Sequence, residues 1–147
     1  MKEHKHFGAY ALIIKDDKIV LIKKKTGPYD GKLDLPGGTI EFGERPEDTL
    51  VRELEEEIGV KVKKYELVDA NSVTFKWKYE DKIINFHHVG IFYKVLSYDN
   101  EIKKEMKITD KNDDSLGADF YTIKALTKDK LSDIAILELE KLGYKLN

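Results

Sequence analysis

The stretch that decides the fold is residues 38–60, which read GTIEFGERPEDTLVRELEEEIGV. Its first part is rich in glycine, and Gly43 lets the backbone turn before Pro46. Proline is favoured in the first turn of a helix, where its missing N–H is not needed. Gly59 stands where a residue in a left-handed conformation commonly ends a helix. The stretch therefore predicts a glycine turn followed by a helix with an apolar stripe to bury, formed by Leu50, Leu54 and Ile58.

Three glutamates give the predicted helix an acidic face. At about 100° per residue, Glu56 and Glu57 lie within roughly 60° of Glu53, so the three carboxylates share one side. Like charges at these spacings destabilise an isolated helix slightly, and a divalent cation would turn that repulsion into attraction. Oxygen donors of this kind bind Mg²⁺ or Mn²⁺. The alternative is a solvated face in a chain with 37% charged residues, which is our interpretation for Glu55.

The same stretch resembles the signature of the Nudix, or MutT-like, hydrolases, G-x5-E-x7-R-E-U-x-E-E-x-G-U, in which U is aliphatic. Both spacers have the right length, and the run of residues 31–38 also resembles the usual lead-in, with Leu33 where tryptophan is common. The resemblance implies an α+β fold, the Nudix α/β/α sandwich, with a mixed β-sheet between helices. Every specified position is filled, by Gly38, Glu44, Arg52, Glu53, Leu54, Glu56, Glu57, Gly59 and Val60.

The resemblance also implies a reaction, the hydrolysis of a phosphoanhydride bond in a nucleoside diphosphate derivative by water, with Mg²⁺ or Mn²⁺ as cofactor. Glu53, Glu56 and Glu57 are then the expected metal ligands, and Glu53 is the first candidate for the general base. Glu44 and Arg52 are expected to brace the loop against the helix through an ion pair, for which arginine has the fixed fork geometry. A simple exposed ion pair is the alternative.

Further site residues are expected outside the helix. Gly37 and Gly38 are expected to bring main-chain groups close to the metal or the phosphates. Lys23 is expected to face the substrate phosphates, the alternative being a solvated strand end. A further metal ligand is expected from a loop near the last strand, with Asp114 as our choice and Asp113 as its alternate; weaker candidates are Glu101 and Glu105. A turn cluster of Asp and Asn is the alternative there.

Aromatic residues gather after the acidic helix. Phe75, Trp77 and Tyr79 alternate along one predicted strand and therefore point the same way. A platform for stacking a base is the functional interpretation, with Trp77 and His87 as candidate substrate-binding residues, and ordinary core is the alternative. His87 and His88 are adjacent, so they face opposite sides of their strand and cannot both join one site.

The periodicity of the rest of the chain supports an α+β domain. The expected turns lie at Asp16–Asp17 and at Glu80–Asp81, the second as the tip of a hairpin. The terminal helix is amphipathic, with Leu131, Ile134, Leu137 and Leu139 on its apolar side. The expected strands are residues 7–14, 18–24, 61–69, 72–79, 82–98 and 118–123, and the expected terminal helix is 130–142.

Composition restricts the classes of function. The chain has 147 residues, which predicts one domain over 1–147, and its net charge of −2 offers no broad cationic field for long nucleic acid. It has no cysteine, which leaves oxygen and imidazole as metal ligands. Neither a signal-peptide pattern nor an apolar run of about 18 residues is present, so we expect a cytoplasmic protein with no membrane partner. Both a monomer and a homodimer stay open.

The substrate is the least determined feature. Phe75 stands 15 residues past Val60, where ADP-ribose pyrophosphatases typically carry proline. By elimination we favour a small-molecule substrate of the nucleoside triphosphate class, hydrolysed by a MutT-like pyrophosphohydrolase that clears the nucleotide pool. The alternatives are a pyrophosphatase for a nucleotide sugar, ADP-ribose or a dinucleoside polyphosphate, removal of an RNA cap or 5′-diphosphate, and a regulatory Nudix module without catalysis.

Overall fold

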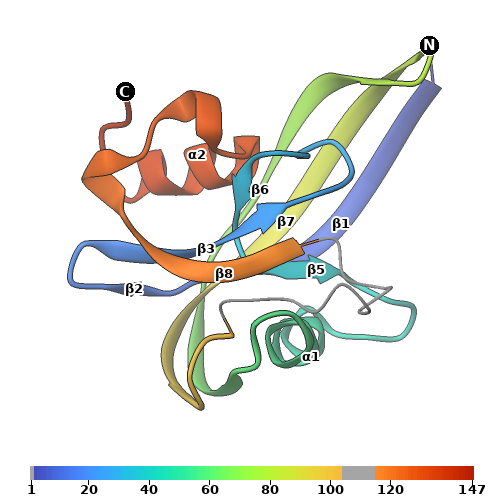
Figure 1. The fold of residues 1–147 in the computed structure, drawn as a ribbon. Coiled ribbons are helices and arrows are strands. Elements are labelled where there is room, and N and C mark those ends of the chain that lie inside the picture. Colours follow the sequence, from blue (N-terminus) through green and yellow to red (C-terminus); the bar gives the residue numbers. More distant parts are fainter. Residues whose placement is uncertain (1, 104–114) are drawn as a thin grey trace.

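A computed structural model describes residues 2–103 and 115–147 of the chain (Figure 1). Its α-helices are α1 (Pro46–Ile58) and α2 (Asp133–Lys141), and short 3-10 turns cover Ile123–Ala125 and Lys128–Lys130. Its strands are β1 (Lys2–Leu12), β2 (Ile14–Lys15), β3 (Lys18–Lys24), β4 (Leu33–Asp34), β5 (Gly37–Thr39), β6 (Lys61–Tyr79), β7 (Lys82–Asp99) and β8 (Ser115–Thr122).

The strands of the described residues form two four-stranded sheets. One has the order β5-β1-β7-β6, with β1 and β7 parallel and the other pairs antiparallel. In the other, β3 pairs with β2, β4 and β8. Side chains of β1 pack into both apolar clusters of the core, so the two sheets together form the middle layer of the molecule.

Both faces of this layer are buried, which follows from the period of two along its strands. Tyr10 and Leu12 of β1 pack into one apolar cluster with α2, whereas Ala9 and Ala11 pack into another cluster with α1. Strand β3 divides its side chains in the same way. Figure 1 shows α1 and α2 on opposite sides of the strands. The predicted α+β sandwich is confirmed, with the β layer divided into two sheets.

Helix α1 forms as its sequence predicts. Pro46 lies in its first turn, Asp48 accepts from the backbone N–H of Arg45, and Gly59 ends the helix with φ of 74°. The predicted apolar stripe is fully buried, since Leu50, Leu54 and Ile58 have no exposed surface. Burial of this stripe fixes the rotation of the helix and therefore the direction of its acidic face.

Three predicted boundaries were wrong, besides that of the last strand, which begins at Ser115 rather than at residue 118. Helix α2 begins at Asp133 rather than at residue 130, because Lys128–Lys130 forms a 3-10 turn and the Ser132 side chain caps the helix through the Ala135 N–H. The two strands predicted at 61–69 and 72–79 are one strand, β6, which absorbs the irregularity as a shift of register between Leu67 and Asp69.

The third correction concerns the amino terminus, where β1 starts at Lys2 rather than at Phe7. Parallel pairing with β7, from Lys2 opposite Ile84 onward, recruits this polar segment into the sheet. Beyond the sandwich, β1, β6 and β7 continue as a three-stranded ribbon, with the predicted hairpin tip at Glu80–Asp81 (Figure 1). No helix in the described parts of the chain is long and apolar enough to cross a membrane.

A buried acid pair ties α2 to β6. Burial, and then a hydrogen bond and repulsion from Asp69, raise the pKa of Glu138 to about 8. Burial by itself would raise the pKa of Asp69, but hydrogen bonds with Lys141 and Glu138 outweigh it and lower that pKa. Asp69 Oδ2 and Glu138 Oε2 are both buried without a hydrogen-bond partner among the described residues. A proton on Glu138 gives both atoms a partner.

Because of this acid pair, we expect the free energy of unfolding of the protein to fall as the pH rises. Because Glu138 holds its proton more tightly when folded, its contribution is complete below the unfolded pKa of about 4.5 and is lost as pH rises towards 8. We expect Glu138→Gln, which keeps a hydrogen-bond donor, to be more stable than wild type by on the order of 2 kcal/mol at pH 8 and by much less at pH 4.5. Chemical denaturation at both pH values measures this, and an equal difference at both would contradict the assignment.

Candidate active site

The glycine loop lies directly against helix α1. Strand β5 pairs with Gly8–Tyr10 of β1, and Gly37 has φ of 142°, a conformation that favours glycine. A Cβ on Gly37 would collide with the backbone of Ala9 and Tyr10. A Cβ on Gly38 would lie 2.5 Å from the carboxyl carbon of Glu53. Gly37 therefore allows the loop to lie against β1, and Gly38 allows its backbone to touch the acidic face.

Glu57 fastens the loop to the helix. Its Oε1 accepts a hydrogen bond from the Gly37 N–H at 2.9 Å, and the residue is only 6% exposed. The neighbouring Glu56 differs, since its side chain is 62% exposed. The three acids thus present a gradient from a buried, anchored carboxylate to one that faces solvent.

Arg52 lies at the centre of this region and donates to four residues. Its Nε and Nη2 hold the two oxygens of Glu44 at 2.8 and 2.9 Å, the bidentate arrangement expected of a guanidinium. Its Nη1 donates to Glu53 at 2.9 Å and to Glu56 at 3.3 Å. Its Nη2 also reaches the carbonyl oxygen of Thr39 at 3.3 Å. The predicted Glu44–Arg52 ion pair is present, and Arg52 extends it to both the loop and the acids.

Glu44 is held in its ionised form. The hydrogen bonds from Arg52, followed by that from the backbone N–H of Glu41, lower its pKa to about 2. The Thr49 hydroxyl donates to the same carboxylate at 3.0 Å. The hydrogen bond with Glu44 is also the main cause that raises the pKa of Arg52. This pair keeps its charges at any pH at which the protein would work.

The donor set of the acidic face fits a hard divalent cation by its chemistry, because it offers carboxylate oxygens only. Within the described residues, no group of three acidic or histidine side chains is already close enough to hold an ion. Glu53 and Glu56 instead accept from Arg52, which neutralises part of their repulsion. A cation bound here would share these two carboxylates with Arg52, which holds one oxygen of each.

The glycine loop gives a steric prediction. Gly38→Ala places a methyl group against the Glu53 carboxylate, so we expect turnover to fall by roughly 10- to 100-fold through displacement of that group. Gly43→Ala is the matched control, because it has positive φ but nothing within 4 Å of the added Cβ. It should cost about 1–2 kcal/mol of stability and little activity. Thermal unfolding and steady-state rates separate the two; equal activity loss in both variants would refute the steric argument.

Other predicted site residues are dispersed. Lys23 is exposed on β3, opposite Leu33 of β4, in the strand that leads towards the glycine loop. Asp114, together with its alternate Asp113 and the weaker candidate Glu105, lies outside the described residues. Glu101 is described and is exposed. The roles proposed for these residues stay predictions.

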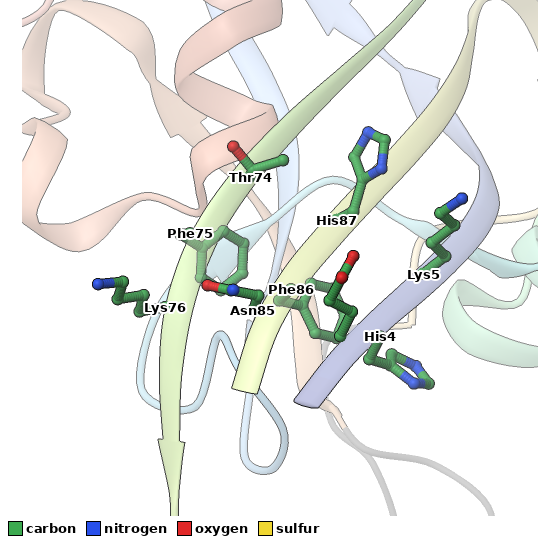
Figure 2. A pocket seen from close by; sticks show the side chains of 9 residues that line it. His4, Lys5, Thr74, Phe75, Lys76, Asn85, Phe86 and His87 are labelled. Atoms are coloured by element: carbon green, nitrogen blue, oxygen red, sulfur yellow. The ribbon is translucent and has the colours of Figure 1, made fainter. Parts of the chain in front are cut away.

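Trp77 and His87 are not brought together. Trp77 lines a cavity of about 470 Å³ that Thr39 of the glycine loop also lines. Trp77 is paired with Ile84 of β7, so the side chains of these two residues lie on the same face of the ribbon. His87 is three positions after Ile84 on β7, so its side chain lies on the opposite face from that of Trp77. His87 lines a separate hollow between Thr74 and Lys5 (Figure 2). Of the two candidates, only Trp77 lies beside the loop.

A buried cluster that sequence reasoning missed lies under the loop. The His88 ring contacts the hydroxyl of Tyr10 through Nε2 at 2.5 Å and that of Tyr29 through Nδ1 at 2.9 Å. Burial, followed by the charges of His6 and Lys24, lowers the pKa of His88 to about 3. The imidazole is therefore neutral at physiological pH, accepting from one tyrosine and donating to the other.

This cluster supports the loop, because Tyr10 pairs with Gly37 across the β1–β5 ladder. The only signal in the sequence was the pair His87-His88, whose members were predicted to face opposite sides of their strand.

The fold and the site together define a class of protein, an α/β/α sandwich whose glycine loop meets an acidic helix. The family model of the NUDIX domain matches residues 4–139, so the chain belongs to the Nudix family. Members of this family generally use divalent metal ions.

Relatives of several activities resemble the chain. An ADP-ribose pyrophosphatase of Methanocaldococcus jannaschii is 32% identical over 85% of this chain and 66% of its own length. An 8-oxo-dGTP diphosphatase of Escherichia coli is 50% identical, but over 30% of this chain and 34% of its own length. Among solved structures, a MutT Nudix hydrolase of Burkholderia pseudomallei has a TM-score of 0.75 at 24% identity, covering 95% of this chain and 99% of its own.

The coverage of the relatives is partial. The chain spans 66%, 51% and 37% of the lengths of three curated relatives that it matches. The solved structure, below 25% identity, supports the fold.

Proposed function

We propose that the chain is a Nudix hydrolase that splits phosphoanhydride bonds in nucleoside diphosphate derivatives, with Mg²⁺ or Mn²⁺ as cofactor. The observation that carries this is the contact between the Gly37–Gly38 loop and the acids of α1. Glu57 anchors the loop, Glu53 lies against Gly38, and Glu56 is exposed to incoming ligand. Together they offer oxygen donors of graded burial beside backbone that a phosphate can approach closely.

The residues of the chain divide the work. Glu53 and Glu56, with Glu57, would hold the metal, which would neutralise diphosphate oxygens and lower the pKa of a bound water. Glu53 is our candidate for accepting the proton of the attacking water, since it lies at the loop. Arg52 donates a hydrogen bond to Glu53 and thereby positions it. Its bond to Glu44 holds the helix against the loop that precedes it. Because Glu57 is buried, water does not compete for the hydrogen bond that it accepts from the Gly37 N–H, and this bond stays strong.

For the substrate we propose a nucleoside triphosphate, hydrolysed to a nucleoside monophosphate and pyrophosphate. The diphosphatases for 8-oxo-dGTP among the relatives support this class. ADP-ribose is the second candidate, because the archaeal ADP-ribose pyrophosphatase aligns over 85% of this chain. Hydrolysis of ADP-ribose would release AMP and ribose 5-phosphate.

A product assay tests the proposal. The chain is incubated with dNTPs, 8-oxo-dGTP, ADP-ribose, nucleotide sugars and dinucleoside polyphosphates, with Mg²⁺ or Mn²⁺ and with chelator. We expect hydrolysis that requires the metal, fastest for a nucleoside triphosphate and yielding pyrophosphate. Fastest release of AMP and ribose 5-phosphate would select the second candidate. A well-folded protein that cleaves none of them would contradict the proposed function and favour a regulatory Nudix module.

A further inference from the structure

Strand β5 is held at both of its ends by helix α1. At one end, the Gly37 N–H donates to Glu57 Oε1 at 2.9 Å. At the other end, the Thr39 carbonyl oxygen accepts from Arg52 Nη2 at 3.3 Å. These two bonds draw the short strand towards the acidic helix, so whatever holds the strand from its other face decides how closely its backbone approaches the acids.

Two side chains of β1 reach the same two ends of β5 from the face that points away from α1. Tyr10 packs in the cluster with α2, and His6, four positions earlier, lies on the same face of the strand. Tyr10 pairs with Gly37, and a Cβ on Gly37 would lie 2.9 Å from Cδ1 of the Tyr10 ring. His6 Nε2 makes a hydrogen bond of 2.7 Å with the side-chain oxygen of Thr39. Each end of β5 is therefore held from both faces.

His88 of β7 connects these two side chains. Its Nε2 is 2.5 Å from the hydroxyl oxygen of Tyr10, and its ring stacks on that of His6 with the centroids 4.8 Å apart and the planes at 4°. The Tyr29 hydroxyl holds its other nitrogen, Nδ1, at 2.9 Å. His88 is also buried. With both nitrogens bonded and one ring face covered, the imidazole has a fixed orientation and fixes Tyr10 and His6 together.

Two glycines make room for this arrangement. Gly8 of β1 pairs with Gly90 of β7. A Cβ on Gly8 would collide with the Tyr10 ring, and a Cβ on Gly90 would collide with the Phe92 ring. The two rings therefore fold back along their strands, over the glycines, and stack with their centroids 5.9 Å apart. This packing directs the Tyr10 hydroxyl towards His88, which lies two positions before Gly90 on the same face.

We propose that His88 is a positioning residue of the active site, which holds strand β5 at the distance from the acids of α1 that turnover requires. Its two contacts act at different ends of the strand, one through Tyr10 and the other through His6. The inference rests on the proposed function, because it takes the backbone of β5 and the acids of α1 to act on one substrate. Since His88 is buried behind β5, its loss should lower kcat more than it changes KM.

Two matched substitutions separate positioning from support of the fold. Tyr10→Phe and Tyr29→Phe each remove one hydroxyl from the same imidazole and keep the aromatic ring. Only Tyr10 pairs with Gly37. We expect kcat to fall roughly 10- to 100-fold in Tyr10→Phe, with KM within about threefold of wild type, and kcat to stay within about threefold in Tyr29→Phe. Thermal unfolding should show a similar loss of stability in both variants.

Conservative variants of His88 provide a rescue test. The amide of glutamine extends one carbon further than that of asparagine, so it can take the place of Nε2 and bond Tyr10, whereas the amide of asparagine can take the place of Nδ1 and bond Tyr29. We expect His88→Gln to keep most of kcat and His88→Asn to lose roughly 10- to 100-fold. Equal kcat in these two variants, both folded, would contradict the proposal. If either is unfolded by circular dichroism, the pair of tyrosine variants decides.

Hydrogen exchange of the Gly37 N–H, followed by NMR, tests the same claim without a substrate. We expect exchange at least about tenfold faster in Tyr10→Phe than in Tyr29→Phe, although both lose one bond to His88. Faster exchange in Tyr10→Phe, together with a wild-type protein that hydrolyses no substrate, would support the positioning of β5 and contradict the proposed function. Hydrolysis by wild type, with equal kcat and equal exchange in the two tyrosine variants, would overturn the role of His88 alone.

Discussion

Glu57→Gln should lower kcat for the best substrate by about 1,000-fold or more while the protein stays folded. Loss of a group that handles metal or protons in the transition state costs about 100- to 10,000-fold. Glu57 is nearly buried, and its Oε1 accepts from the Gly37 N–H. The amide oxygen of glutamine can accept the same hydrogen bond, so the loop keeps its anchor while the negative charge is lost.

Stability distinguishes this account from a structural role for Glu57. Removing one of three neighbouring negative charges relieves repulsion, so the unfolding temperature should stay the same or rise. Glu55→Gln is the matched control, because Glu55 lies on the same helix, is exposed and faces away from the acids. It should leave both kcat and stability unchanged. A Glu57→Gln enzyme with kcat within threefold of wild type would remove Glu57 from the machinery.

Arg52→Gln should lower kcat/KM by roughly 100-fold, the second largest effect that we expect. Arg52 holds Glu44, Glu53, Glu56 and the Thr39 carbonyl at once. Glutamine cannot span them, so the carboxylates repel one another and leave their positions. Displacement of catalytic groups by about 1 Å can cost that much rate.

Arg52→Lys tests whether geometry or charge matters. Lysine keeps the positive charge but not the planar fork that holds both oxygens of Glu44. We therefore expect most of the activity loss to persist in Arg52→Lys. Both variants should also lose stability, by on the order of 1–3 kcal/mol, because the Arg52 and Glu44 side chains are only 25% and 18% exposed and lose charge-assisted hydrogen bonds. Full activity in Arg52→Lys would show that only the charge is needed.

The acidic helix and its loop could be predicted from the sequence, because their signals are local. The glycines, Pro46 and the apolar stripe act within one segment, and α1 begins and ends where they indicate. The start of β1 could not be predicted, since its polar residues become a strand only through pairing with β7, about 80 residues further along the chain. The predicted start of α2 was wrong because the spacing of apolar residues continues through the 3-10 turn and the Ser132 cap that precede the helix.

The candidate site divides in the same way. Spacing along one helix indicated the acids, and the structure adds how they differ in burial. The cluster of Tyr10, Tyr29 and His88 joins residues 59 and 78 positions apart, so no local pattern could indicate it. The bonds from Arg52 to Glu53 and Glu56 were also missed, because the resemblance assigned Arg52 to Glu44 alone. Whether Trp77 or His87 lies beside the loop depended on the register of β6 with β7, which only the structure supplies.

The most direct test of the central claim is binding of Mn²⁺ in the presence of a nucleotide analogue, followed by electron paramagnetic resonance. Wild type is compared with Glu56→Gln, which changes an exposed member of the acidic face, and with Glu55→Gln on the other side of the same helix. The account predicts tight binding by wild type and Glu55→Gln, and binding at least about tenfold weaker for Glu56→Gln. Equal affinity in all three proteins, or no uptake of Mn²⁺ by wild type, would contradict it.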